Sequence, residues 1–173
     1  MDQRRIFLDA NVIIECFRIG VWTELSNGHC LETVEMCERE ALTGQTTSYG
    51  HVAINAATLR AGLKASHIVS RQERNRLTTV HRTCVNMDPG EKDLFAHLFA
   101  SHSPLPPLIV LSSADKGVIV QAKALGWLDH LISLEELLQD CRVAPAKLAC
   151  LDRQYRIPFL SEKRTQVRLG IIP

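Results

Sequence analysis

The sequence of 173 residues predicts a helix-rich α/β protein with short buried strands in a parallel sheet. Two observations support this prediction. The apolar run at residues 6–8 ends at Asp9, and the apolar run at residues 108–111 is followed by Ser113 and Asp115. A buried strand that ends in a carboxylate is typical of open parallel sheets, which build their sites at the carboxyl ends of their strands. Helical spacing of apolar residues and capping signals occupy most of the sequence between these two runs.

The individual elements follow from local patterns. Ser70, with Glu73 three residues later, is a capping-box pattern that begins a helix. Gly126 is placed to end another helix as its C′ residue. In chain order we expect a strand at 5–9, helices at 11–18 and 31–42, a loop at 45–50, helices at 52–65 and from 70, a helix at 91–100, a strand at 108–112, a helix at 116–125, a short strand at 131–133 and a helix at 134–138.

Composition and charge exclude several classes of protein. The content of hydrophobic residues is 46% and that of charged residues 23%, which is ordinary for a globular domain. No apolar run approaches the length of a membrane span, and no signal peptide precedes the first strand. The six cysteines show no Cys-x-x-Cys pair, so we expect free thiols and a cytoplasmic location.

The net charge of +1 does not by itself indicate a nucleic-acid partner, but its distribution is uneven. Residues 60–82 contain six basic side chains and a single acid, Glu73. The ordinary interpretation of such a run is a solvated helix face, and the alternative is a surface that follows phosphates. The basic residues that we assign to nucleic-acid binding under that alternative are Arg71, Arg74 and Arg76.

Four short motifs, in order, are similar to those of a known family. They are residues 8–13 (Leu-Asp-Ala-Asn-Val-Ile), the acidic segment 32–40, residues 89–96 (Pro-Gly-Glu-Lys-Asp-Leu-Phe-Ala) and residues 110–115 (Val-Leu-Ser-Ser-Ala-Asp), followed by Gly126-Trp127 and residues 131–135. With these motifs, residues 5–140 resemble the PIN-domain metal-dependent nucleases, which include the toxin ribonucleases of toxin–antitoxin pairs. The resemblance implies a PIN-like domain at 1–142, followed by an extension at 143–173 that packs on or beside it.

The resemblance also implies a fold, a cofactor and partners. The fold is a three-layer α/β/α sandwich with a central parallel sheet and three or four acids at one edge. The expected cofactor is Mg²⁺ or Mn²⁺, and the expected activity is endonucleolytic cleavage of RNA. A homodimer and an antitoxin protein are the partners that the family suggests.

Each motif of the resemblance assigns site residues to this sequence. The first acid is Asp9 and the fourth is Asp115, with Asn11 and Ser113 as groups that hold Asp9 and a bound water or phosphate. For the third acid, Glu91 and Asp93 both fit the start of a helix. Their side chains point about 200° apart around the helix, so only one of them can face the site. We favour Asp93, with Glu91 as the alternative.

For the second acid, several carboxylates of one predicted helix are candidates. Glu40 fits best, since it lies on the same inward stripe as Val34 and Cys37, and a carboxylate on an apolar stripe needs a reason such as a metal. The remaining acids are expected to lie on a solvated face, and they are Glu32, Glu35 and Glu38. Trp127 is expected to be a packing anchor rather than a base-stacking platform.

The chemistry explains why such acids would gather. Close carboxylates repel one another unless a cation neutralises them, and oxygen ligands favour magnesium or manganese over zinc. Such an ion activates water toward a phosphodiester. Two alternatives stay open. One is a non-catalytic PIN-like module that binds RNA or protein, and the other is a phosphohydrolase with Asp9 as nucleophile. Asp9 and Asp115 alone would also suit helix N-caps.

Overall fold

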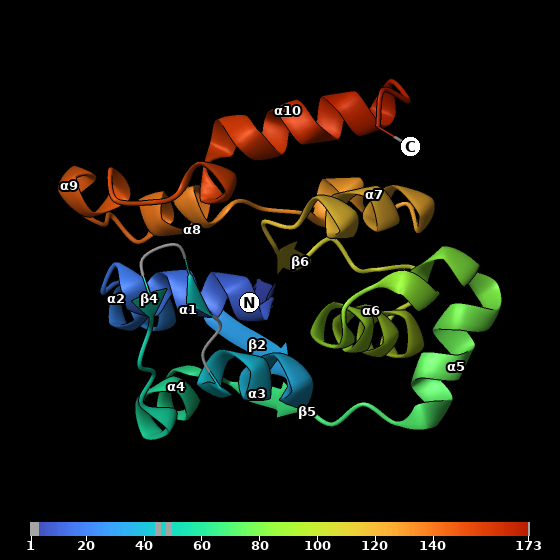
Figure 1. The fold of residues 1–173 in the computed structure, drawn as a ribbon, viewed down its shortest axis with the longest axis horizontal. Coiled ribbons are helices and arrows are strands. Elements are labelled where there is room, and N and C mark those ends of the chain that lie inside the picture. The colour runs from blue at the N-terminus through green and yellow to red at the C-terminus, as the bar shows by residue number, and fades with distance from the viewer. Residues whose placement is uncertain (1–3, 44–45, 48–49, 173) are drawn as a thin grey trace.

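The structure is a computed structural model that describes residues 4–43, 46–47 and 50–172. Its centre is a parallel sheet of four strands with helices on both faces (Figure 1). The strands lie in the order β5-β2-β1-β6, and every neighbouring pair is parallel. Their bounds are β1 Arg5–Leu8, β2 Cys30–Val34, β5 Ala65–His67 and β6 Ile109–Ser112. The predicted three-layer α/β/α fold is confirmed.

Helices account for most of the described chain. Those of the first half are α1 Ala10–Arg18, α2 Trp22–Gly28, α3 Glu35–Thr43, α4 Ala56–Gly62 and α5 Arg71–Val80. Those of the second half are α6 Pro89–Ser101, α7 Lys116–Ala124, α8 Leu134–Asp140, α9 Pro145–Leu148 and α10 Ile157–Arg168. The 3₁₀ turns are η1 Arg82–Asn86, η2 Leu128–His130 and η3 Arg153–Tyr155, and β3 Thr46–Thr47 pairs with β4 Gly50–His51 as a short antiparallel ribbon.

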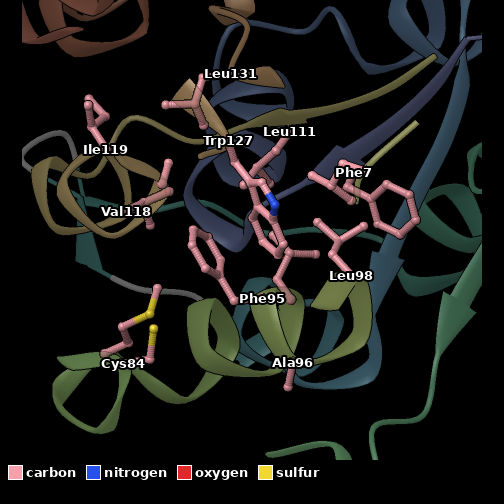
Figure 2. Close-up of a cluster of buried hydrophobic side chains, with 14 of the residues drawn as sticks. Phe7, Cys84, Phe95, Ala96, Leu98, Leu111, Val118, Ile119, Trp127 and Leu131 are labelled. Atoms are coloured by element: carbon pink, nitrogen blue, oxygen red, sulfur yellow. The ribbon is translucent and has the colours of Figure 1, made fainter. Parts of the chain in front are cut away.

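Alternation along β1 divides the core between the two faces of the sheet. Ile6 and Leu8 face one cluster, with buried residues of α1, α2 and α8, and Phe7 faces the other. Figure 2 shows the second cluster, in which Phe95 and Trp127 pack together with ring centroids 5.2 Å apart. Trp127 is only 6% exposed, so its prediction as a packing anchor is confirmed. Burial on both faces explains why the central strand β1 and its neighbour β6 are apolar without polar alternation.

Several element predictions are confirmed by local chemistry. Ser70 caps α5 through a complete capping box with Glu73. Gly126 follows α7 with φ +75°, a left-handed conformation that suits glycine. The expected strand at 131–133 is reduced to a single parallel bridge between Leu111 and Leu131.

Two predicted helices were wrong in part. The expected helix at 31–42 is strand β2 followed by α3, and the expected helix at 52–65 is α4 followed by the edge strand β5. A short apolar run has the same appearance in a buried strand and in a buried helix, and pairing with β1 decides for the strand. Of the expected loop at 45–50, residues 45, 48 and 49 lie outside the described residues.

The C-terminal residues pack on the same core as the sheet. In Figure 1 α10 lies along α7 and α8. Leu160 and Val167 of α10 are buried in the cluster that contains Phe7, and Lys123 Nζ donates to the carbonyl of Val167 at 2.7 Å. Within the described residues, every helix is too short or too polar to span a bilayer.

Candidate functional site

The two acid-tipped strands predicted from the sequence are neighbours in the sheet. β1 and β6 pair in parallel with Leu8 opposite Ser112, so the residues that follow them meet at the carboxyl edge. Ser113 Oγ donates to Asp9 Oδ2 at 2.9 Å, and the backbone N–H of Ala10 donates to Asp9 Oδ1 at 2.7 Å. Asp9 is 2% exposed. Ser113 therefore fixes a buried carboxylate, as expected.

Asp115 occupies the N-cap of α7 and faces the same edge. Its Oδ1 accepts from the backbone N–H of Gly117 at 2.5 Å and of Val118 at 3.4 Å. The backbone N–H of Asp115 donates in turn to Ser113 Oγ at 3.2 Å. Asp9 similarly caps α1. The capping role and the site role thus belong to the same side chains.

Two further acids come from α3 and from the start of α6. Glu40 Oε1 accepts from the backbone N–H of Gly90 at 3.0 Å. A Cβ on Gly90 would lie 3.0 Å from Cys37 Sγ and even closer to the Glu40 carboxylate, so the absent side chain permits this approach. Glu91 is 7% exposed. Glu40 therefore joins Glu91 at the carboxyl edge.

These carboxylates perturb one another. Burial raises the pKa of Asp9 to about 6, against hydrogen bonds from Ser113 and Ala10 and with the help of Glu40 and Asp115. The pKa of Glu91 is raised to about 8, mainly by burial and further by repulsion from Asp9, Asp115 and Asp88. The pKa of Glu40 is also raised, first by burial, although its bond from Gly90 opposes this.

The acids line two adjoining hollows. The first, which we call the acidic hollow, has a volume of about 250 Å³ and is lined by Asp9, Asn11, Glu40, Asp88, Pro89 and Glu91 among others. The second, the middle hollow, has about 180 Å³ and is lined by Thr83, Asn86, Asp88, Glu91, Asp115 and Gln121 among others. Asp88 and Glu91 border both, so the two hollows form one polar surface. Asn11 lies at this site as expected.

Asp93 does not line either hollow. It is bound by both nitrogens of one guanidinium edge, with Arg74 Nε 2.5 Å from Oδ1 and Arg74 Nη2 2.7 Å from Oδ2. Asp93 is still close enough to Glu40 to contribute to the raised pKa of that carboxyl. The geometry favours Glu91 for the third acid, which reverses the preference for Asp93 drawn from the sequence.

The same ion pair changes the interpretation of the basic segment. Arg74 is engaged with Asp93 in holding α5 against α6, so a phosphate would have to compete with a buried carboxylate. Arg71 is exposed, and the guanidinium of Arg76 lies 5.7 Å from the ring centroid of Phe99. For Arg71 and Arg76 the role in nucleic-acid binding stays a prediction.

The acids expected on a solvated face divide into two kinds. Glu35 is exposed and pairs with Arg39, as expected. Glu32 and Glu38 were predicted wrongly, because both are buried and ion-paired, Glu32 with Arg5 and Glu38 with Arg60. Glu32 belongs to β2 rather than to a helix, so its side chain points into the layer between sheet and helices.

Two residues of the site escaped the sequence analysis. Asp88 borders both hollows, although the sequence analysis did not assign it to the site. Cys37 was placed only on the inward stripe of the predicted helix and is buried, and its Sγ lies 3.9 Å from Asp9 Oδ1. Burial raises the pKa of the Cys37 thiol well above its ordinary value, with a further contribution from Asp9, so the neutral thiol donates to that carboxylate.

The donor set fits a hard divalent cation by its chemistry. Asp9, Glu40, Asp88, Glu91 and Asp115 offer only oxygen, and none of them has an ion pair within the described part of the chain. Among the described residues, however, no group of three or more His, Cys, Asp or Glu side chains is arranged so that it could hold a metal ion. The acids thus supply oxygen donors of the right kind but are not gathered around one ion position.

Comparison with family models, with curated proteins and with solved structures gives no match for this chain.

Proposed function

We propose that this protein is a metal-dependent endoribonuclease of the PIN type, which hydrolyses RNA phosphodiesters with Mg²⁺ or Mn²⁺. The observation that supports the proposal best is the meeting of Asp9, Glu91 and Asp115 at the carboxyl edge of the sheet, with Glu40 beside them. These carboxylates lack a cationic partner among the described side chains, which is unusual for the two that are buried, Asp9 and Glu91, because buried carboxylates are ordinarily paired.

The proposed roles follow from the contacts. Asp9, Glu91 and Asp115 would hold the cation, and Glu40 would complete the set from α3. Ser113 keeps Asp9 in place through its hydrogen bond, and Asn11 lines the same hollow where a phosphate oxygen or water would lie. When bound, the cation would activate water and stabilise charge on the leaving oxygen.

Cleavage of single-stranded RNA by the purified protein tests the proposal. We expect cleavage only with added Mg²⁺ or Mn²⁺, and its loss with EDTA. Asp9→Asn and Asp115→Asn should each lower the rate by at least about 100-fold, because each removes a ligand charge. The matched control is Glu35→Gln, since Glu35 is an exposed acid of the same chain.

The same variants give a second readout that does not depend on activity. Burial, together with repulsion from Glu40 and Asp115, destabilises the ionised Asp9 in the metal-free protein, so Asp9→Asn should raise the melting temperature measured in EDTA. Wild-type activity in Asp9→Asn would contradict the site assignment. RNA binding without cleavage would instead support the non-catalytic PIN-like module, and phosphate release from small esters would support an aspartate-nucleophile phosphohydrolase.

The remaining parts of the proposal concern partners and location. We propose a cytoplasmic homodimer, with an antitoxin as its candidate protein partner. Light scattering coupled to gel filtration tests the dimer. Co-expression with the product of an adjacent gene tests the antitoxin, which should co-purify with this chain and inhibit RNA cleavage.

A further inference from the structure

A third hollow continues the polar surface away from the acids. It has a volume of about 380 Å³ and is bordered by His81, Phe99, Leu125, Gly126, Trp127 and His130 among others. We call it the ring-lined hollow. Gln121 borders the middle hollow and Leu125 the ring-lined hollow, and these residues are one helical turn apart, about 6 Å along α7. At the start of η1, His81 borders the ring-lined hollow and Thr83, two residues later, borders the middle hollow.

The third hollow lies at a defined distance from the acids. Glu91 and Phe99 are both on α6, eight residues apart, which is about 12 Å along the helix axis. Successive nucleotides of a stacked strand rise by about 3.4 Å along its axis. A stretch of about three to four stacked nucleotides would therefore span the distance from the acids to the ring-lined hollow.

The side chains of the ring-lined hollow differ in kind from those of the acidic hollow. Among the described residues that line it, none is Asp or Glu. His81 meets Phe99 edge to face, with centroids 5.3 Å apart and planes at 90°. Phe99, His81 and His130 are half-buried, so part of each ring faces solvent. Flat rings that remain partly open are suited to stacking a base.

Polar groups at the hollow add directional contacts. His130 Nδ1 lies 2.8 Å from the carbonyl of Ile109, and because a carbonyl only accepts, Nδ1 carries the hydrogen. In the neutral ring Nε2 is then an acceptor. The exposed Arg76 is not part of the described lining, but it holds its guanidinium over the ring of Phe99, which is, at 5.7 Å from the ring centroid. A ring-shaped ligand with an attached anion would meet both groups.

We propose that the ring-lined hollow binds the base of a nucleotide, with Arg76 close to its phosphate, and serves as a subsite for single-stranded RNA next to the acid cluster. This inference rests on the proposed nuclease function for its substrate. It also assigns Arg76 a specific contact, the phosphate of the bound nucleotide, which the basic segment of the sequence alone did not identify.

Tryptophan fluorescence provides a direct test in EDTA, where cleavage is excluded. The chain contains two tryptophans, and only Trp127 borders the hollow, whereas Trp22 stacks on Phe17 in the other core cluster. In Trp22→Phe, which reports Trp127 alone, AMP should change the emission in a saturable way. Ribose 5-phosphate, which has no base, should not.

Variants locate the binding. His81→Ala and Arg76→Gln should each weaken AMP binding by about tenfold, as for loss of one stacking or phosphate contact. The matched controls are His51→Ala and Arg39→Gln, which alter exposed side chains far along the chain from the hollow. Calorimetry of AMP binding to the wild type and to His81→Ala gives the same comparison if Trp22→Phe does not fold.

A pentaribonucleotide separates an RNA subsite from a site for free nucleotides. Its affinity should fall with His81→Ala as that of AMP does. No AMP binding, or an oligomer affinity that His81→Ala leaves unchanged, would overturn the inference. AMP binding that persists in a protein without metal-dependent cleavage would defeat the proposed nuclease function and leave the nucleotide site standing.

Discussion

Two buried carboxylates on neighbouring strands have opposite surroundings. Glu32 in β2 receives hydrogen bonds from Arg5 at 2.5 and 2.8 Å and lies 2.6 Å from His67 Nε2. Asp9, just beyond β1, has hydrogen bonds but no cation. A paired carboxylate is part of the fold, whereas an unpaired one costs stability and indicates function.

The group formed by Glu32, Arg5 and His67 extends to a second histidine, His97, which stacks on His67. The rings of His67 and His97 have centroids 4.1 Å apart, and His97 Nδ1 lies 3.6 Å from Glu73. Burial lowers the pKa of His97, and His67 lowers it further, although Glu73 opposes this. For Glu32, burial raises the pKa, but the bonds from Arg5 and His67 outweigh it, so the pKa is lowered.

Both shifts predict lower stability in acid. A histidine whose pKa is lowered in the folded state takes up a proton on unfolding, so stability falls as the pH drops below its ordinary value of about 6.5. A carboxyl whose pKa is lowered gives stability that is lost as the pH falls below about 4.3 and through its folded pKa. The raised pKa values of Asp9, Glu40 and Glu91 act in the opposite direction, so the contribution of His97 is isolated by comparison with His97→Gln. The free energy of unfolding in urea of the wild type minus that of His97→Gln should fall between pH 7 and pH 4. A difference that does not change with pH would contradict the assignment.

At the scale of elements, α5 and α6 are joined by the pair of Arg74 and Asp93. The Asp93 side chain is 5% exposed and that of Arg74 37%. Arg74→Ala leaves Asp93 buried without a partner and should lower the free energy of unfolding by roughly 2–3 kcal/mol.

Urea unfolding measures that loss, and the control is Arg71→Ala. Arg71 is exposed on the same helix, so its removal should change stability by no more than about 0.5 kcal/mol. Equal stability of the two variants would mean that the pair is not important to the fold. RNA-binding experiments on α5 should accordingly replace Arg71 or Arg76 and leave Arg74 in place.

Local signals predicted the helices with caps, and long-range pairing decided the rest. The capping box at Ser70 and the acid-tipped strands at Asp9 and Asp115 could be predicted because their chemistry lies within a few residues. Strand β2 could not, since Leu31 and Val34 have helical spacing and only their place beside β1 makes them a strand. The choice between Glu91 and Asp93 depended on Arg74, nineteen residues away.

At the scale of the whole molecule, the C-terminal extension is tied to the first helix by buried charge. Arg18 binds Glu15 through two nitrogens at 2.6 Å, and its Nη2 also donates to the carbonyl of Cys150. The backbone N–H of Asp152 donates to Glu15 Oε1 at 2.9 Å. Tyr155 Oη donates to the carbonyl of Asn11 at 3.2 Å, next to Asp9. The extension therefore supports the segment that carries the site.

Removal of Arg18 should show how much this connection matters. The Glu15 side chain is 3% exposed, so Arg18→Ala leaves a buried charge and should cost about 3–5 kcal/mol of unfolding free energy. Arg153→Ala, which alters a side chain that is 82% exposed, is the control and should be neutral. Denaturant titration of both variants measures the difference, and a cost below 1 kcal/mol for Arg18→Ala would contradict the role given to this pair.

The parallel topology also bears on how many ions the acids would hold. Asp9, Asp88 and Asp115 occupy the N-cap positions of α1, α6 and α7, so three helix dipoles direct their positive ends to one edge. Each contributes about half an elementary charge, or about +1.5 in total. A bound divalent cation would keep its carboxylate ligands ionised, so the five carboxylates supply about −5.

With the helix dipoles the balance at this edge is therefore about −3.5, and one divalent cation would leave about −1.5. A second ion would make the edge positive before any phosphate had bound. We expect one Mn²⁺ per chain in equilibrium dialysis at pH 7, and two tightly bound ions would contradict this balance of charge.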